Sequence, residues 1–186
     1  MKILAVAGDI DIQRIGGAEA HFIEVLKRIA PKLEKVTVLV GENTSLKNAF
    51  VNIPNVEIIK VKYPKVPNLS WLVYSFFSLP YAIRADFDLV WLKQEYLAWN
   101  GLILKILIRK PVYVTCQNPN LATEEWVGKG ILAVLFQKTL GKIFNGFLMF
   151  PLRFANTVAA VSSYSASLAK KYGAKRVVII PNGVTC

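Results

Sequence analysis

A pair of glycines near the N-terminus is the first indication of a ligand site in this chain of 186 residues. Gly16 and Gly17 stand in IGGAEAHFIEVL, and a pattern of helical period begins directly after them. Glycine lets a ligand come close to the backbone, and a helix N-terminus offers unpaired N–H groups and a positive dipole end. The pair therefore predicts a site for a phosphate or a sugar. The alternative is a turn that only lets the helix pack.

Seven short apolar runs, rich in valine and isoleucine, are separated mostly by longer stretches of helical period. The strand candidates are Lys2–Ala7, Lys35–Val40, Val56–Val61, Phe87–Leu92, Val112–Cys116, Thr157–Val161 and Arg176–Ile180. The helical stretches are Ala18–Ala30, Leu69–Ala85, Glu95–Arg109, Thr123–Phe150 and Ser163–Tyr172. Short, continuously apolar runs are typical of strands buried on both faces of a parallel sheet. The pattern predicts an α/β fold, a Rossmann-like doubly wound parallel sheet of about seven strands.

The position of the glycine pair agrees with such a sheet. Open sheets of this class bind ligands beyond the carboxyl ends of their strands, where the strand order reverses. The loop GDIDIQRIGG follows the first predicted strand. We therefore expect Gly16 and Gly17 at the ligand-binding edge.

Length and composition indicate one globular domain in a reducing compartment. A hydrophobic share of 54% and a charged share of 19% exclude a disordered chain. The two cysteines, Cys116 and Cys186, form no disulfide scaffold, so we expect free thiols. The N-terminal MKILAVAG is too short an apolar stretch for a signal peptide, which favours the cytoplasm.

The net charge of +11 is unevenly distributed. No acidic residue follows Glu125, whereas eight basic residues do: Lys129, Lys138, Lys142, Arg153, Lys170, Lys171, Lys175 and Arg176. Such a bias is typical of proteins with an anionic partner, and a basic solvated face is the alternative. No nucleic-acid-binding signature accompanies the charge, so we expect no nucleic-acid partner.

Two separated motifs resemble one known family. The order of GGAEAHFIEVLKRIA and KVTVLV is similar to the N-terminal half of family-4 retaining glycosyltransferases, which have the two-domain GT-B fold. Near the other end, NTVAAVSSYSASLAKKYGAKRVVIIPNGV resembles the segment that closes the first domain of that family. The two motifs span nearly the whole chain in the family's order.

The resemblance implies that residues 1–186 are the N-terminal, acceptor-side domain of a hexosyltransferase. Such an enzyme moves a hexose from a nucleotide-sugar to a carbohydrate or lipid-linked acceptor with retention of configuration. The nucleotide-sugar is a substrate, and no bound cofactor or metal is implied. Asn182 and Gly183 correspond to the hinge into the second, donor-binding domain, which this chain lacks. We therefore expect the chain to be inactive alone and to need that domain, from its own gene product or from a separate subunit.

The same resemblance assigns site residues. Gly16 and Gly17 would border the donor diphosphate or the acceptor. Glu19 occupies the family's Gly-Gly-x-Glu position, although an acidic residue in a first helical turn also stabilises the helix dipole. His21, the one histidine in the sequence, either touches substrate or packs.

The chain departs from the family after the run VYVT. Family members commonly carry a histidine in this loop, but here Gln117 and Asn118 follow Cys116. Amide side chains can hydrogen-bond sugar hydroxyls, yet they cannot transfer protons near neutral pH. We expect both amides to contact donor or acceptor, and the pattern identifies no catalytic residue.

The segment Lys129–Phe150 predicts an amphipathic helix. Its apolar side includes Phe136, Ile143 and Phe147, and its polar side includes Lys138, Lys142 and Asn145. Lysines on the polar face are typical of a helix that lies in a membrane interface, and they interrupt any run long enough to span. The accompanying hypothesis is peripheral binding at the inner face of an anionic membrane. A helix that only covers the sheet is the alternative.

Two other functions remain open from the residues alone. One is a non-catalytic, membrane-associated partner or scaffold subunit. The other is a dinucleotide-binding domain, because Glu42 lies just beyond the second predicted strand, where a ribose-binding acid belongs. Against it, GDIDIQRIGG contains no G-x-G-x-x-G.

Overall fold

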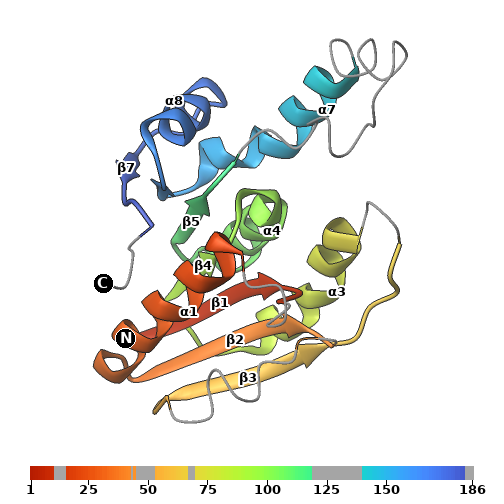
Figure 1. Ribbon diagram of the computed structural model, residues 1–186. Helices are drawn as coiled ribbons and strands as arrows, with labels where there is room; N and C mark the ends of the chain where they lie inside the picture. The colour runs from red at the N-terminus through yellow and green to blue at the C-terminus, as the bar shows by residue number, and fades with distance from the viewer. Residues whose placement is uncertain (11–15, 43, 45–52, 67–69, 119–139, 183–186) are drawn as a thin grey trace.

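The computed structural model describes residues 1–10, 16–42, 44, 53–66, 70–118 and 140–182. These residues form a seven-stranded sheet in the order β3-β2-β1-β4-β5-β6-β7 (Figure 1). The strands are β1 (Lys2–Gly8), β2 (Lys35–Gly41), β3 (Val56–Val61), β4 (Leu89–Leu92), β5 (Val112–Cys116), β6 (Thr157–Ala160) and β7 (Val177–Ile179). Every neighbouring pair is parallel. The structure confirms the predicted fold class.

The strand order reverses between β1 and β4. β1 pairs with β2 on one side and with β4 on the other, and Val6 is opposite Leu92 near the carboxyl ends. A doubly wound sheet binds ligands beyond the carboxyl ends at such a reversal. This edge is where the functional side chains should be sought.

Helices cover both faces of the sheet. One face carries α1 (Gly17–Ile29), whose Phe22 and Leu26 pack with Ile3 and Ala5 of β1. The other face carries α3 (Ser70–Arg84), α4 (Ala98–Ile108), α7 (Leu140–Met149) and α8 (Ser163–Lys171). Three 3₁₀-helices, Ala30–Lys32, Glu95–Leu97 and Phe150–Phe154, complete the described elements. Because both faces of β1 are covered, apolar residues are required at successive positions.

The predicted strand bounds agree with the structure to within two residues. The predicted helix Glu95–Arg109 begins as the 3₁₀-helix Glu95–Leu97 and continues as α4. It ends where Arg109 adopts a left-handed conformation with φ of 60°. The predicted helix Thr123–Phe150 lies within the described residues only from Leu140 onward, as α7 and the start of Phe150–Phe154.

The predicted polar side of this last helix is wrong at Asn145. Asn145 is buried, together with Leu148 and Met149, whereas Ile143 and Phe147 are exposed. α7 therefore packs inward through a side that includes an amide and turns aromatic and aliphatic side chains outward. Phe136 and Lys138 lie outside the described residues.

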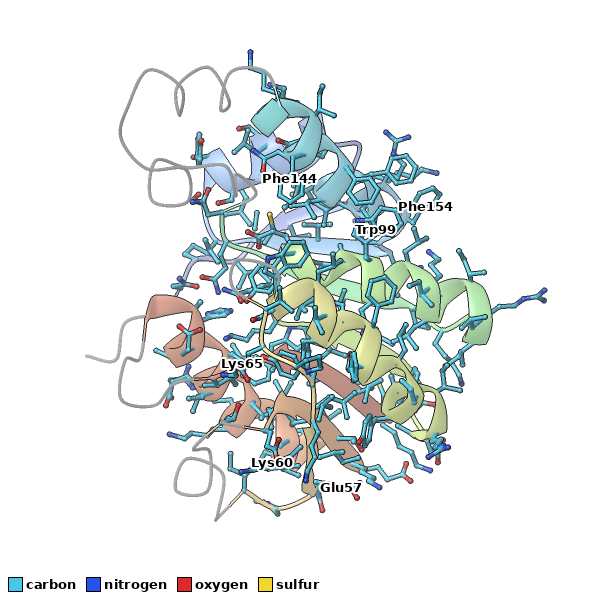
Figure 2. All side chains as sticks on the ribbon, turned by 90° about the vertical axis from the view of Figure 1, so that its right-hand side faces the viewer. Glu57, Lys60, Lys65, Trp99, Phe144 and Phe154 are labelled. Atoms are coloured by element: carbon cyan, nitrogen blue, oxygen red, sulfur yellow. The ribbon has the colours of Figure 1, made fainter. Side chains whose placement is uncertain are left out.

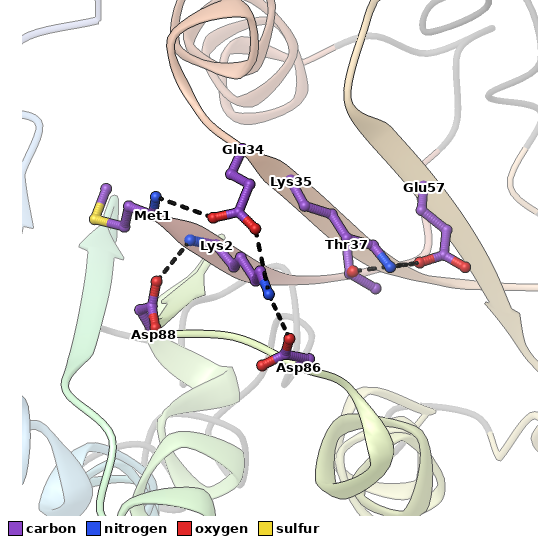
Figure 3. A network of polar contacts seen from close by, with 8 residues as sticks. All are labelled: Met1, Lys2, Glu34, Lys35, Thr37, Glu57, Asp86 and Asp88. Atoms are coloured by element: carbon purple, nitrogen blue, oxygen red, sulfur yellow. Dashed lines mark hydrogen bonds and ion pairs between the residues drawn. The ribbon is translucent and has the colours of Figure 1, made fainter.

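Polar contacts join the strand beginnings at the amino edge, opposite the expected ligand edge (Figure 3). Lys2 Nζ lies 2.6 Å from Asp86 Oδ2 and 3.3 Å from Glu34 Oε1. The backbone N–H of Lys2 also donates to Asp88 Oδ2 at 2.8 Å. The hydrogen bond to Asp86 raises the pKa of Lys2. Exposed pairs of this kind contribute little to stability, so we assign the network to alignment of the strand ends.

Candidate functional site

The start of α1 presents bare backbone at the reversal point. Gly16 is the N-cap residue, with φ −79° and ψ 171°, and provides no side-chain cap. A Cβ added to Gly17 would lie 3.8 Å from Nδ2 of Asn182, so the segment after β7 passes close to this helix terminus. The structure thus brings together Gly16, Gly17 and the predicted hinge residue Asn182. Gly183 lies outside the described residues.

Glu19 binds a buried lysine that the sequence analysis did not identify. Lys93 directly follows β4, and its Nζ lies 2.7 Å from Glu19 Oε1. The Lys93 side chain is only 1% exposed, and that of Glu19 is 20% exposed. Burial lowers the pKa of Lys93, and the hydrogen bond and charge of Glu19 oppose this effect. Glu19 therefore holds the helix terminus of α1 against the end of β4.

This ion pair also explains one of the two glycines. A Cβ at Gly16 would lie 2.8 Å from Glu19 Oε2, closer than real Cβ contacts come. The carboxylate that binds Lys93 lies directly beside the backbone of Gly16. A side chain at this position would push the carboxylate away from the ammonium.

A second buried acid, Glu95, holds the loop that contains the predicted amides. Its two carboxyl oxygens accept the backbone N–H groups of Gln117 and Asn118, each at 2.9 Å. Burial raises the pKa of Glu95, and these N–H donors partly offset the effect. The Gln117 carbonyl accepts a hydrogen bond from Ser165 Oγ at 2.6 Å. The loop after β5 is thus fixed from both sides at the carboxyl edge.

The side chain of Gln117 has an unsatisfied donor. Its Nε2 is buried and has no hydrogen-bond partner among the described residues. A buried polar group without a partner calls for an explanation, such as a water or ligand site. The neighbouring thiol of Cys116 is buried, and burial raises its pKa, so it is not a reactive nucleophile.

A third polar cluster surrounds Asp9, which follows β1. Its Oδ2 accepts a hydrogen bond from the Tyr63 hydroxyl at 2.5 Å and lies 3.1 Å from Lys65 Nζ. A Cβ at Gly41 would lie 1.7 Å from Asp9 Oδ1, so a side chain there would displace the Asp9 carboxylate. Burial and the bond to Asp9 raise the pKa of Tyr63. Asp9 therefore fixes the ends of β1 and β2 relative to the segment after β3.

His21 faces an apolar groove. The groove has a volume of about 250 Å³ and runs between α1 and the sheet, where Trp91, Tyr113 and Ile180 also line it. Trp91 Nε1 donates to Thr115 Oγ1 at 2.9 Å, which fixes the indole. Burial lowers the pKa of His21. The histidine thus lines a groove between α1 and the sheet, together with Thr115 of β5.

The structure therefore gathers most of the predicted site residues at one edge. Gly16, Gly17 and Glu19 lie at the start of α1, and Glu95 places Gln117 and Asn118 at the end of β5. Sequence reasoning missed Lys93 and Glu95, although polar residues directly after a buried strand were the available signal. Within the described ranges, no three His, Cys, Asp or Glu residues are grouped so that they could hold a metal ion.

Comparisons with known proteins identify the family and the fold. The model of Glycosyltransferase Family 4 matches residues 15–186. No curated protein matches the sequence. Among solved structures, HepE (Alr3699) of Anabaena, in complex with UDP and glucose, has a TM-score of 0.62 and 19% identity. The match covers 99% of this chain and 45% of that one.

Two further solved structures are similar. Sucrose-phosphate synthase of Thermosynechococcus elongatus has a TM-score of 0.67 and 13% identity, over 99% of this chain and 49% of that one. MurG of Acinetobacter baumannii has a TM-score of 0.58 and 16% identity, over 100% of this chain and 46% of that one. The chain spans about half the length of these proteins, so the expected half of a GT-B architecture is confirmed. Because the family model covers all but the first residues, the chain belongs to Glycosyltransferase Family 4.

Proposed function

We propose that residues 1–186 form the N-terminal, acceptor-side domain of a retaining hexosyltransferase that uses a nucleotide-sugar donor. One observation carries the proposal: the bare backbone of Gly16–Gly17 and the passing Asn182 meet at the reversal point between β1 and β4. HepE was solved with UDP and with UDP-glucose, which supports a uridine nucleotide as the donor. The acceptor is a carbohydrate or a lipid-linked sugar.

The residues of the edge take separate roles in this proposal. The N–H groups at the start of α1 face the diphosphate or the acceptor, where a negative charge is favoured. Gln117 offers its unpaired Nε2 to a sugar hydroxyl, and Glu95 keeps the loop in place. Glu19 acts through Lys93 by fixing the helix terminus. Catalysis by orientation and electrostatics requires the second domain across the cleft.

Titration of the ¹⁵N-labelled chain with UDP-glucose tests the proposal. We expect weak binding with amide shift changes centred on Gly16 and Gly17, and little or no sugar transfer by the isolated chain. Gly17→Val should abolish the shifts, because its side chain would occupy the ligand's space. The fold should persist, since the nearest atom to a Cβ there is 3.8 Å away.

Gly146→Ala is the matched control, because a Cβ there meets nothing within 4 Å. This variant should bind UDP-glucose as the wild type does. Shift changes that avoid the glycine turn, or robust transfer by the isolated chain, would refute the proposed role.

Peripheral association with an anionic membrane is the second part of the proposal. None of the helices in the described ranges combines the length and hydropathy needed to cross a bilayer. On α7, however, Ile143 is 70% exposed and Phe147 is 55% exposed, and the neighbouring Lys142 is exposed too. Apolar side chains beside a lysine on one helix suit a membrane interface.

Vesicle co-sedimentation tests this second part. Vesicles of phosphatidylcholine with phosphatidylglycerol should bind the chain, and vesicles of phosphatidylcholine alone should bind it weakly. Lys142→Glu should weaken binding about tenfold or more, because each basic residue near an anionic surface contributes about 1 kcal/mol. Phe147→Ser should also weaken binding, and that loss should persist in high salt. Arg28→Glu on α1, with the same change of charge on the other face, is the control.

A further inference from the structure

The outer side of α3 is apolar and exposed. Phe76 and Phe77 are 55% and 46% exposed, and Tyr81 and Ile83 are exposed as well. A helix on the face of a sheet normally turns polar side chains to water. The sequence of α3, SWLVYSFFSLPYAIR, contains one charged residue, Arg84. Its outer side is therefore suited to contact with something other than water.

The aromatic side chains of α3 line a groove that also has two basic side chains, Lys62 and Arg84. The groove has a volume of about 500 Å³ and is formed by Phe76, Phe77, Pro80 and Tyr81, with Lys62 and Arg84 beside them. Lys62 is 81% exposed and has a long contact of 3.5 Å to Glu42. In the part of the chain that the structure describes, Arg84 belongs to no ion pair, and Asp86, two residues later, pairs with Lys2. The groove thus combines an aromatic floor with the positive charges of Arg84 and of Lys62, which is loosely paired with Glu42.

The helices next to α3 also expose apolar side chains. α3 packs against α4, and α4 packs against α7. Figure 2 looks onto this layer, with Trp99, Phe144 and Phe154 above α3. At the end of α4, Ile106 and Leu107 are also exposed.

The charges of this layer have one sign. The sequences of α3, α4, α7 and Phe150–Phe154 contain no aspartate or glutamate, whereas they contain Arg84, Lys105, Lys142 and Arg153. On the opposite face of the sheet, α1 carries charges of both signs, Glu19 and Glu24 with Lys27 and Arg28. Among the described helices, an apolar layer whose charges are all positive thus lies on one face of the sheet.

We propose that the α3 groove binds an anionic phospholipid of a bilayer surface, as a second lipid contact beside that of α7. Lys62 and Arg84 contact the phosphate, and the rings of Phe76, Phe77 and Tyr81 lie against the glycerol and first acyl carbons. The absence of acidic residues from the layer favours an anionic surface as the occupant. Asn182 lies beside Gly17 at the carboxyl edge, so the second domain expected after it begins away from this groove.

This inference rests on the proposed membrane association and adds an orientation to it. A single amphipathic helix leaves a protein free to rotate about that helix. Contacts on both α3 and α7 turn the α3–α4–α7 layer toward the bilayer. The sheet then lies above the membrane, with α1 on the side facing water.

Vesicle binding of α3 variants tests the groove separately from α7. Arg84→Glu should lower the partition coefficient on phosphatidylglycerol-containing vesicles about tenfold or more. The double variant Phe76→Ser and Phe77→Ser should lower it about tenfold at any salt concentration. Arg28→Glu, with the same change of charge on α1, should leave it unchanged. All the altered side chains are exposed, so near-UV circular dichroism and the thermal midpoint should match the wild type.

A fluorescence-quenching experiment complements the vesicle-binding measurements. In Phe77→Trp, the new indole should be quenched by vesicles with brominated acyl chains, beyond the quenching of the wild-type tryptophans. Loss of binding in the α7 variants alone, with the α3 variants binding normally, would overturn the groove assignment. A wild-type dimer that the α3 variants convert to monomer would assign the groove to a second copy and overturn it too. Neither result bears on UDP-glucose binding at Gly17, which tests the glycosyltransferase function by itself.

Discussion

Lys93 Nζ, at the end of β4, lies 2.7 Å from Glu19 Oε1 in the first turn of α1, and this contact spans the reversal point of the sheet. The two residues are 74 positions apart in the chain. Lys93 is buried, so its ammonium depends on Glu19 for a counter-charge. The glycine turn, the helix terminus and the end of β4 are therefore held as one unit.

Replacing Glu19 should lower the free energy of unfolding more than replacing Lys93 does. Glu19→Gln leaves a buried ammonium without its counter-charge and should lower the free energy of unfolding by about 3 kcal/mol. Lys93→Met removes the buried charge itself and should cost less. The double variant should be more stable than Glu19→Gln alone. Urea unfolding measures all three, and strictly additive effects would show that the two residues are not coupled.

Glu95 should determine the order of the amide loop. In Glu95→Gln, one carboxyl oxygen becomes an amide nitrogen that cannot accept an N–H donor, so one of the two loop bonds is lost. We expect a loss of about 2 kcal/mol in unfolding free energy. Hydrogen exchange at the amides of Gln117 and Asn118 should accelerate. Glu24→Gln, at a half-buried position of α1 whose ion pairs are at the surface, should change neither quantity by much. Protection retained in Glu95→Gln would contradict the assignment.

Alanine substitutions at two helical glycines should change the stability of the protein in opposite directions. A Cβ at Gly101 of α4 would lie 2.6 Å from Leu92 Cδ1 and 2.8 Å from Val112 Cγ1, both on buried strands. Gly101→Ala should therefore destabilise the protein by about 1–3 kcal/mol through overpacking. Gly146→Ala in α7 has open space and should stabilise it by up to about 1 kcal/mol through helix propensity. Thermal and urea unfolding of the pair measure the difference, and equal effects would mean that α4 does not pack so closely.

His21 should make the protein less stable as the pH falls below about 6.5. Burial lowers its pKa in the folded state, so the unfolded chain takes up a proton first. The unfolded state binds more protons in this window, and the free energy of unfolding decreases as the pH falls through it. With only one histidine in the sequence, His21→Leu should flatten this dependence between about pH 7 and 5.5. An NMR titration that places the His21 pKa above 6.5 would reverse the sign and contradict the prediction.

The strands could be read from the chain because of the way the sheet is covered. β1 and β2 are buried along nearly their whole length, since helices cover both faces, and this burial requires the continuous apolar runs KILAVAG and KVTVLVG. The glycine turn could be placed as well, because any loop after the first strand of a parallel sheet reaches the carboxyl edge. These features depend on local pattern and on general rules of parallel sheets.

The partners of the site residues could not be read in the same way. Glu19 was expected to face a ligand or the helix dipole, yet it binds Lys93. That contact exists only because β4, rather than another strand, pairs with β1. The loop of Gln117 and Asn118 was anticipated, whereas its attachment to Glu95 follows from the neighbouring positions of β4 and β5. A long-range pair has no signal in a single sequence beyond polar residues after a buried strand.

The helix α7 shows the same division most clearly. The spacing of Lys142, Ile143 and Phe147 was enough to predict an amphipathic helix, because helical period is a local property. Which side turns inward was decided by the 3₁₀-helix Phe150–Phe154 and by α4, against which α7 packs, and they place Asn145 inside. The chain alone thus specified the elements, the sheet class and the edge at which we propose that ligand binds. Only the tertiary structure decided the ion pairs behind that edge and the apolar face left to the outside, since both depend on contacts between residues far apart in the sequence.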